Sequence, residues 1–294
     1  MNDDSLQRFI FDHTAVRGEY VRLRTSYQEA VKQHNYPPLV ERTLGEFLVA
    51  ISMLSSTLKF DGMISIQARG NGKLAIVMAE CTHHKRLRGI VRGELASVTE
   101  HDTLSSLLGD ATLAITIEPT RGERYQGIVP LEGETLAQCL EQYFQQSEQL
   151  HTQIQIAVND EVACGFLLQR LPHTQHTKGD VPYLADGDER WNHLSMLGST
   201  LKPDEMIELP SEQILHRLFH QEPLRLLEQT DIRFGCSCSE ERIGQALVSL
   251  GIEEVESILD EIGTIEIECH FCLHQYRFDP DRARALFADT PSKH

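Results

Sequence analysis

Four of the seven cysteines lie in two close pairs near the end of the chain, and this pattern constrains the fold more than any other feature. The pairs are Cys236-Ser237-Cys238 and Cys269-His270-Phe271-Cys272, separated by a single stretch that contains no further cysteine. Two pairs of thiolates at such short spacings supply the four ligands that a tetrahedral zinc ion takes. We therefore expect the C-terminal part of the chain to fold around one zinc ion held by these four residues.

The residues around the two pairs predict the local structure of that site. Ser239 follows the first pair as the N-cap of a helix that ends at Gly251. A second helix follows and ends at Gly263, and the alternation over Thr264–Phe271 predicts a strand leading into a hairpin. The first pair is thus expected just before a helix N-terminus, whose partial positive charge favours thiolates, and the second pair in a strand-to-turn knuckle.

Two histidines and three further cysteines are the other side chains whose chemistry bears on metal binding or oxidation. His270 and His274 lie beside the second pair and could compete for the metal, but the four cysteines are favoured because the two pairs complete an all-thiolate site. The three remaining cysteines are scattered, and they are interpreted as small buried hydrophobes without an assigned role: Cys81, Cys139 and Cys164.

Charge and hydropathy exclude several classes of protein. The chain has 294 residues and a net charge of −17, which disfavours nucleic acid and anionic membrane surfaces as partners. No apolar run is long enough to span a bilayer, and the start Met1-Asn2-Asp3-Asp4 lacks the profile of a secretion signal. We therefore expect a cytoplasmic protein, and an odd number of cysteines there indicates metal or redox chemistry rather than a disulfide framework.

The N-terminal part carries the patterns of hairpins and long helices. Residues 37–59 predict a helix, because apolar residues recur in steps of three or four after Pro37 and Pro38. Strands are predicted around Gly70-Asn71-Gly72, which forms a hairpin turn, and the further predicted elements are the strands Thr112–Glu118, Tyr125–Leu131, Ile154–Val158 and Gly165–Gln169 and the helix Glu134–Leu150. This pattern indicates an α+β fold, with an N-terminal mixed domain around an antiparallel sheet.

Residues 171–189 are polar and aperiodic, and they are typical of a loop. Two short amphipathic helices follow, one containing Trp191, Leu194 and Leu197, and one N-capped by Ser211 that contains Ile214, Leu218 and Phe219. Such short helices are marginal alone and must pack on another surface. The sequence therefore predicts a helical linker between the N-terminal domain and a small C-terminal zinc-binding α+β domain.

The usual role of a four-cysteine zinc site is structural, and a redox switch is the alternative. Structural zinc contributes about 10–16 kcal/mol to the folding of small peptides, and a domain of about 60 residues has little stability of its own. Oxidation of the ligands would therefore eject the metal and unfold the domain. Thiolates are the species that oxidants attack, and the disulfides Cys236–Cys238 and Cys269–Cys272 are locally available. The spacing permits such a switch without establishing it.

Several short segments, together with the two cysteine pairs, match one known family in order along nearly the whole chain. They are Arg8-Phe9-Ile10-Phe11-Asp12, Val16-Arg17-Gly18-Glu19, Leu44-Gly45-Glu46, Leu58-Lys59-Phe60-Asp61-Gly62, Tyr125-Gln126-Gly127-Ile128-Val129, Tyr143–Leu150, Tyr276 and Phe278. Through them the chain resembles the heat-shock protein 33 family of redox-regulated chaperones. The resemblance implies three parts: an N-terminal α+β chaperone core over 1–178, a metastable helical linker over 179–231, and a redox-switch zinc domain over 232–294.

The resemblance also implies a mechanism. The reduced form, with zinc on Cys236, Cys238, Cys269 and Cys272, is expected to be inactive. Oxidative stress is expected to form two disulfides, release zinc, unfold the zinc domain and loosen the linker. The active form, commonly a homodimer, then binds unfolding client proteins as a holdase without ATP. Apolar faces of the linker helices are the expected client surface, although packing in the core explains these residues equally well.

Two other classes of function remain as alternatives. In the first, the zinc module is purely structural and docks a fixed partner as a binding or adaptor protein, and it should then bind best when reduced and metal-loaded. A thiol oxidoreductase is the enzymatic alternative, but such enzymes place one Cys-X-X-Cys at a helix N-terminus, whereas here it follows a predicted strand. The sequence also has no Gly-rich phosphate loop or nucleophile elbow, so we do not expect an enzyme.

Overall fold

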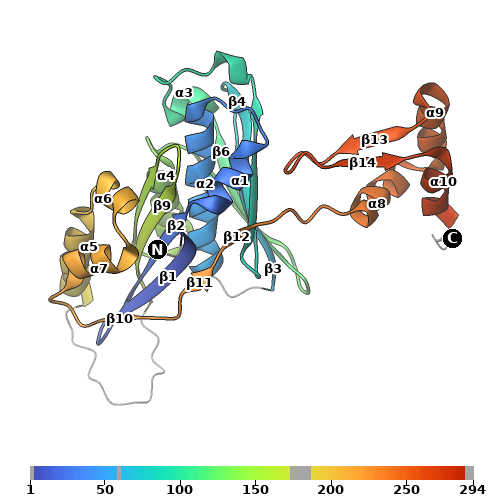
Figure 1. The fold of residues 1–294 in the computed structure, drawn as a ribbon. Helices are drawn as coiled ribbons and strands as arrows, with labels where there is room; N and C mark the ends of the chain where they lie inside the picture. The colour runs from blue at the N-terminus through green and yellow to red at the C-terminus, as the bar shows by residue number, and fades with distance from the viewer. Residues whose placement is uncertain (1–2, 58–60, 173–186, 289–294) are drawn as a thin grey trace. The chain divides into compact units, whose positions relative to one another are not determined.

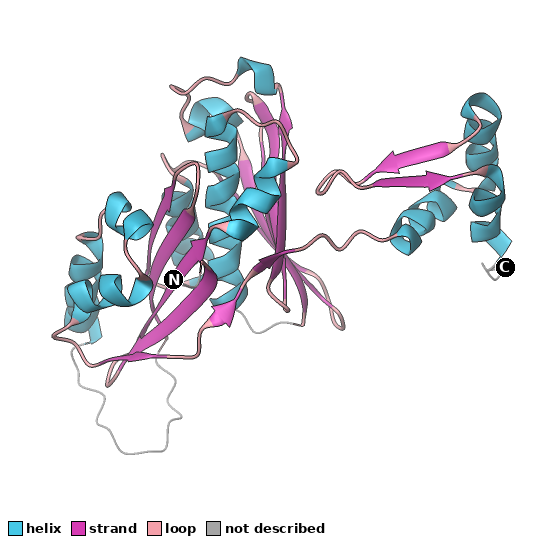
Figure 2. Ribbon diagram, in the orientation of Figure 1, coloured by secondary structure: helices cyan, strands magenta, loops and turns pink. Residues whose placement is uncertain are grey.

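The computed structural model describes residues 3–57, 61–172 and 187–288, which form two compact units, Met1–Gly235 and Cys236–His294 (Figure 1). Both units combine helices with antiparallel strands, so the predicted α+β class is confirmed (Figure 2). In the described part of the chain no helix has both the length and the apolar character needed to cross a bilayer.

The first unit contains two six-stranded sheets rather than the single sheet that the sequence suggested. One sheet has the order β10-β1-β2-β9-β8, with β11 also paired to β1, and the other has the order β12-β5-β4-β3-β6-β7. The strands of the first sheet are β1 Asp4–Phe11, β2 Val16–Leu23, β8 Thr152–Val158, β9 Ala163–Arg170, β10 Leu224–Leu226 and β11 Thr230–Asp231. Those of the second are β3 Gly62–Arg69, β4 Leu74–Thr82, β5 Arg86–Gly93, β6 Thr112–Pro119, β7 Tyr125–Pro130 and β12 Arg233–Phe234.

The long helix α2 (Pro38–Thr57) lies between the two sheets and explains why there are two (Figure 1). It is buried on nearly every side, so each of two opposite faces must be covered by a sheet. Glycines let the backbones approach closely: a Cβ on Gly89 of β5 would lie 2.7 Å from Leu44, and one on Gly165 of β9 would lie 2.3 Å from Val49. The shared core of the two sheets and α2 is the largest in the chain.

Most predicted elements of the first unit are confirmed, and one is altered. The described part of the predicted helix 37–59 is α2, and the predicted hairpin at Gly70-Asn71-Gly72 joins the antiparallel pair β3 and β4. The predicted helix Glu134–Leu150 is α4 (Leu136–Tyr143) followed by a π-helical turn over Phe144–Glu148. The helix begins two residues after its predicted start, because Thr135 is its N-cap and accepts a hydrogen bond from the Gln138 amide through its side chain. This unit also contains the short helices α1 (Thr25–Lys32) and α3 (Leu104–Leu108) and a 3-10 turn over Leu95–Ser97.

Three short helices cover the outer face of the first sheet: α5 (Gly187–Ser199), α6 (Pro203–Glu208) and α7 (Ser211–Phe219) (Figure 1). Their apolar side chains form a second core with residues of β1, β2 and β9. Polar contacts reinforce it, because the Tyr20 hydroxyl donates to the Met206 carbonyl at 2.5 Å and Arg22 donates to the Met206 and Ile207 carbonyls. The helices of the predicted linker therefore pack on the first unit, as marginal helices must.

Two details of the linker differ from the sequence-based prediction. Helix α6 was not predicted, although Pro203 at its first position is a favoured helix start. Ser211 is not the N-cap of α7 but its first residue, because Pro210 takes the extended N-cap conformation and no side chain caps the helix. The predicted loop over 171–189 and the predicted boundary at 178/179 fall mostly outside the described residues, so the three-part division stays a prediction.

The second unit is small and close to its predicted form. It contains α8 (Glu240–Leu250), α9 (Ile252–Ile262), the hairpin of β13 (Ile265–Glu268) and β14 (Gln275–Phe278), and α10 (Pro280–Ala288), which the sequence analysis did not include. Ser239 caps α8 as predicted, and Gly251 and Gly263 end α8 and α9. Six buried apolar side chains form its core within the described residues: Leu247, Val255, Leu259, Ile265, Phe278 and Ala283.

Candidate metal centre

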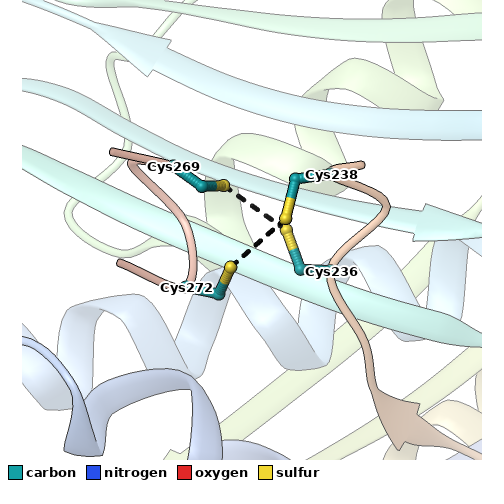
Figure 3. Close-up of side chains that lie close together, drawn as sticks. All are labelled: Cys236, Cys238, Cys269 and Cys272. Carbon is teal, nitrogen blue, oxygen red and sulfur yellow. Dashed lines mark hydrogen bonds between the residues drawn. The ribbon is translucent and has the colours of Figure 1, made fainter. Parts of the chain in front are cut away.

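The sulfur atoms of the four clustered cysteines meet at one point of the second unit (Figure 3). All four lie within 4.8 Å of one another, with Cys236 to Cys269 at 3.6 Å and Cys238 to Cys272 at 3.4 Å. Cys269 is buried, and the other three are half-buried. The two pairs are therefore brought together as the sequence spacing predicted, each contributing two sulfurs to one cluster.

The cluster has the dimensions of a tetrahedral metal site. Four sulfurs bound at about 2.3 Å to a central ion lie about 3.8 Å from one another, close to the separations of the two shortest contacts. No other group of three or more histidine, cysteine or acidic ligand atoms within the described ranges comes this close together. All seven cysteines lie in these ranges and none forms a disulfide. The donor set thus fits one thiophilic metal ion.

The first pair of ligands is braced by the start of α8. The Ser239 hydroxyl accepts a hydrogen bond from the Arg242 amide and so fixes the chain where it leaves the Cys236-Ser237-Cys238 segment. The Arg242 guanidinium reaches back and donates to both the carbonyl and the hydroxyl of Ser237, each at 3.0 Å. The residue between the two ligands is therefore held from one side, which limits the conformations open to both sulfurs.

The second pair lies in the turn that joins β13 to β14. The Cys269 amide donates to the His274 carbonyl at 2.9 Å, and the Leu273 amide donates to the Cys269 carbonyl at 2.7 Å. These bonds fold the segment back so that both Cys269 and Cys272 point to the same side. The turn requires a left-handed residue, and Leu273 fills this position with a φ of 53°. A leucine there is strained, because its Cβ approaches its own carbonyl oxygen.

Burial and crowding act on the protonation of the cluster. Burial raises the pKa of the Cys238 thiol, although the Tyr276 hydroxyl, which hydrogen-bonds to its sulfur, opposes the rise. Burial also raises the pKa of Cys272. The hydrogen bond to Cys238 in turn raises the pKa of the Tyr276 hydroxyl. Without a cation among them, four adjacent sulfurs cannot all carry negative charge in this space, so the protonated thiols are favoured. A bound divalent cation instead favours the thiolates.

The other candidate residues lie outside the cluster. His270 and His274 are not among the grouped ligand atoms, and the His274 ring instead packs edge-on against Tyr276 with ring centres 4.7 Å apart. Cys81, Cys139 and Cys164 are buried in the first unit, where burial raises the pKa of each thiol. Sequence reasoning did not identify the supporting contacts of Arg242 and Tyr276, because neither contact follows from residue spacing.

Comparison with known proteins identifies similar chains over the full length. A family model described as Hsp33 protein matches residues 4–279. The chain is 46% identical to the 33 kDa chaperonin of Hahella chejuensis, with complete coverage of both chains, and 44% identical to that of Shewanella loihica, with 99% of this chain and 98% of the relative covered. The crystal structure of a 33 kDa chaperonin from Thermotoga maritima shares the fold, with a TM-score of 0.82, 23% identity and coverage of 97% and 98% of the two chains.

Proposed function

The chain belongs to the Hsp33 protein family, and from this premise we propose that it is a redox-regulated holdase chaperone that works without ATP. Cys236, Cys238, Cys269 and Cys272 hold one zinc ion in the reduced, inactive protein. Oxidation to two disulfides releases the zinc and activates binding of unfolding proteins. The protein acts in the cytoplasm under oxidative stress, forms a homodimer when oxidised and catalyses no reaction.

The observation that carries this proposal is the contrast between the four-sulfur cluster and the small core beside it. A tetrahedral all-sulfur site suits zinc in a reducing compartment. The second unit encloses only six fully buried apolar side chains among its described residues. Since a domain of about 60 residues is marginal without additional support, the metal site supplies what the core lacks. Loss of the site then amounts to loss of the unit's fold.

When bound, zinc supplies the positive charge that keeps the four sulfurs ionised together. The chain positions those sulfurs through the start of α8 and the turn between β13 and β14. Arg242 braces Ser237 between the first two ligands, and the backbone bonds of Cys269 orient the second two. The chain therefore holds the four sulfurs close together through its own hydrogen bonds, and oxidation of one pair removes two of the four ligands at once.

The redox step uses a peroxide as the oxidant. One thiolate attacks the peroxide, the O–O bond breaks, and a sulfenic acid and one water form after proton uptake. A neighbouring thiol then displaces the hydroxyl of the sulfenic acid, which forms the S–S bond and a second water. The two thiols that form each disulfide thus give two electrons to one peroxide. We propose the pairs Cys236–Cys238 and Cys269–Cys272, although the sulfur positions also allow cross-pairing because all four lie within 4.8 Å.

Helices α5 to α7 provide the proposed client surface. In this structure Leu194, Ile214 and Phe219 are buried against the first sheet, and Trp191, Leu197 and Leu218 are partly buried there. We propose that unfolding of the second unit loosens these helices and exposes their apolar faces. Surfaces of this kind bind unfolded chains through apolar contact rather than a sequence motif, which agrees with a holdase of broad specificity.

The test combines metal release with client aggregation. The reduced protein is treated with hydrogen peroxide at mild heat while a metal chromophore reports zinc and light scattering reports the aggregation of a denaturing client. We expect one zinc per chain to be released and client aggregation to fall in step with it. Peptide mapping of the oxidised product assigns the disulfides. Zinc release without any effect on the client would refute the chaperone proposal.

The same samples distinguish the two alternatives. A static zinc module binds its partner best when reduced and metal-loaded, so oxidation should abolish its binding instead of creating it. A thiol oxidoreductase should reduce insulin with many turnovers per protein in the presence of a reductant. The Cys139→Ala variant is a matched control, because it removes a buried cysteine outside the cluster and should release zinc like the parent protein.

A further inference from the structure

Helix α7 carries two histidines on its exposed face, one turn apart. His216 and His220 are both exposed and stand four positions apart, so their side chains lie one above the other. Their ring centres are 5.8 Å apart, and the ring planes differ by 30°. Within the described residues neither imidazole has a hydrogen bond or an ion pair. Four ring nitrogens on one short surface are therefore open to a ligand.

The opposite face of α7 fixes this pair in place. Ile214, Leu215 and Phe219 are almost fully buried in the core that α5 to α7 form with the first sheet. His220 is the C-cap of the helix and keeps a helical backbone, with φ −60° and ψ −18°. Both histidines therefore stand on a backbone that is held by packing, so that little ordering is needed before they can bind together.

The separation of the two rings suits a shared metal ion. Two imidazoles that each bind one ion at about 2.0–2.1 Å through nitrogen place their ring centres about 5 Å apart. The observed 5.8 Å requires only small side-chain rotations to reach that distance. We propose that His216 and His220 form a second metal site, which binds a borderline divalent cation such as Zn²⁺, Ni²⁺ or Cu²⁺ through two imidazole nitrogens.

Nearby charges do not oppose such a cation. Arg217, the neighbour of His216, is paired with Glu205 at 2.7 Å. His193 of α5 is paired with Glu222 at 2.8 Å, and Arg190 contacts the same carboxylate. Glu212 lies one turn before His216 and is exposed on α7, so it adds negative charge on the approach to the pair. The cationic side chains named here are therefore each paired with a carboxylate, and Glu212 adds a negative charge on the same helix.

The proposed site differs in kind from the four-cysteine cluster. It lies in the first unit, offers two neutral nitrogen ligands instead of four thiolates, and leaves the remaining coordination positions to water. Imidazole ligands favour copper, nickel and zinc, and a two-ligand site binds them weakly enough to exchange. The ion would bind across the last turn of α7, so a bound metal stabilises the folded helix and reduces its local opening. This inference does not depend on the proposed chaperone activity.

The experiment titrates Ni²⁺ into the reduced full-length protein that already carries its cysteine-bound metal, with calorimetry and backbone hydrogen exchange as readouts. We expect one additional ion per chain and slower exchange of the α7 amides. His216→Gln and His220→Gln should each weaken this binding at least about tenfold, because each removes one of two ligands. His101→Gln, which removes an exposed histidine elsewhere, should bind like the parent protein.

A spacing variant makes the test specific for the pair. The double change His216→Gln with Gln213→His keeps the number of histidines on α7 but moves them seven positions apart, about 10 Å along the helix. We expect this variant to lose the additional ion and the protection of α7. If it binds Ni²⁺ as the parent does, or if both single variants retain the parent affinity, the proposed site does not exist.

Discussion

The first unit buries a long helix between two six-stranded sheets, whereas the second unit encloses six apolar side chains and a four-cysteine cluster among its described residues. Apolar burial contributes about 25 cal/mol per Å², so the large core of the first unit is stable without a metal ion. The second unit has too little apolar surface to bury for the same result. One chain thus combines a part stabilised by packing with a part that, under the proposed function, depends on a bound metal ion.

This difference explains how one chain can lose the structure of one part and keep the other. Oxidants act on thiolates and leave buried leucine and phenylalanine side chains untouched. The cysteines of the first unit are buried, and burial raises the pKa of their thiols, which keeps them protonated and unreactive. The clustered cysteines, three of which are half-buried, all lie in the second unit. The second unit therefore contains both the cysteines that are most open to oxidation and the smaller apolar core.

The largest expected effect is the loss of a metal ligand. Cys269→Ser should unfold the second unit, because metal-dependent folding energy in such sites is on the order of 10 kcal/mol. In the first unit, α2 should keep its protection from hydrogen exchange, because it is buried in the core between the two sheets. Hydrogen exchange of α8 to α10 measures the loss. Cys139→Ala is the control with an intact second unit. Persistent protection of α9 from hydrogen exchange in Cys269→Ser would show that the second unit folds without the metal site.

Truncation of one buried phenylalanine in each unit gives the next largest effect. Phe278→Ala and Phe47→Ala should each cost about 3–5 kcal/mol, because both side chains are fully buried. In the second unit this cost should appear as metal affinity that is weaker by about 100-fold or more in chelator competition. In the first unit it should lower the urea midpoint and leave the metal affinity unchanged. Equal loss of metal affinity in both variants would show that the units are not independent.

The two units should also respond to pH in opposite directions. Glu19 is fully buried, and the burial raises its pKa to about 7. Ser56 donates to one of its carboxyl oxygens, and the other has no partner in the described part of the chain. Because the folded pKa lies above the unfolded value, its stabilising contribution is complete below about pH 4.5 and is lost as the pH rises through 7. The expected loss is up to about 3 kcal/mol.

The second unit should gain stability over the same pH range, because protons compete with the metal for the sulfurs. Urea unfolding between pH 5 and 8 measures the first unit, and chelator competition measures the second. Glu19→Gln should make the pH dependence of the first unit less steep and raise its stability at pH 8, while Glu46, whose pKa burial also raises to about 7, keeps the remaining slope. If Glu19→Gln and the parent protein show the same slope between pH 5 and 8, the buried carboxyl is not the cause.

The smallest expected effect is a gain in the stability of the turn between β13 and β14. Leu273→Gly should stabilise the metal-bound turn by about 1 kcal/mol, because glycine adopts the φ of 53° without strain. The metal should then require a higher chelator concentration or a longer exposure to peroxide for its release. His13→Gly, which relieves a left-handed residue of the first unit with a φ of 62°, is the matched control and should not change metal release. A weaker metal site in Leu273→Gly would show that packing of the leucine outweighs its strain.

Much of the second unit could be predicted because its signals are local. Ser239, Gly251 and Gly263 mark helix ends through their own backbone and capping preferences, and each acts within a few residues. The cysteine spacing defined the metal-binding group directly. The exception is α10, which was left out of the prediction. The amphipathic pattern of α10 is short, and no sequence feature marks this helix as clearly as the cysteine pairs mark the metal site.

The first unit could be predicted only in part, because its arrangement depends on distant contacts. The hairpins β3–β4, β6–β7 and β8–β9 have local signals and were predicted, whereas β1, β2 and β5 were not. The segregation of the strands into two sheets depends on how α2 packs against both. The N-cap of α7 was assigned to Ser211 from residue type, whereas the path of the chain through Pro210 decides it. Likewise the pairing of Tyr20 and Arg22 with α6 joins residues more than 180 positions apart.

The sequence by itself determined which four cysteines come together, the helix caps around them and the α+β class, because thiol spacing, glycine conformation and side-chain alternation act over short distances. Only the tertiary structure decided that two sheets enclose α2, that α5 to α7 cover the outer face of one sheet, and that Leu273 takes a left-handed conformation beside the metal ligands. These features depend on which surfaces are buried together, and burial is a property of the folded chain as a whole.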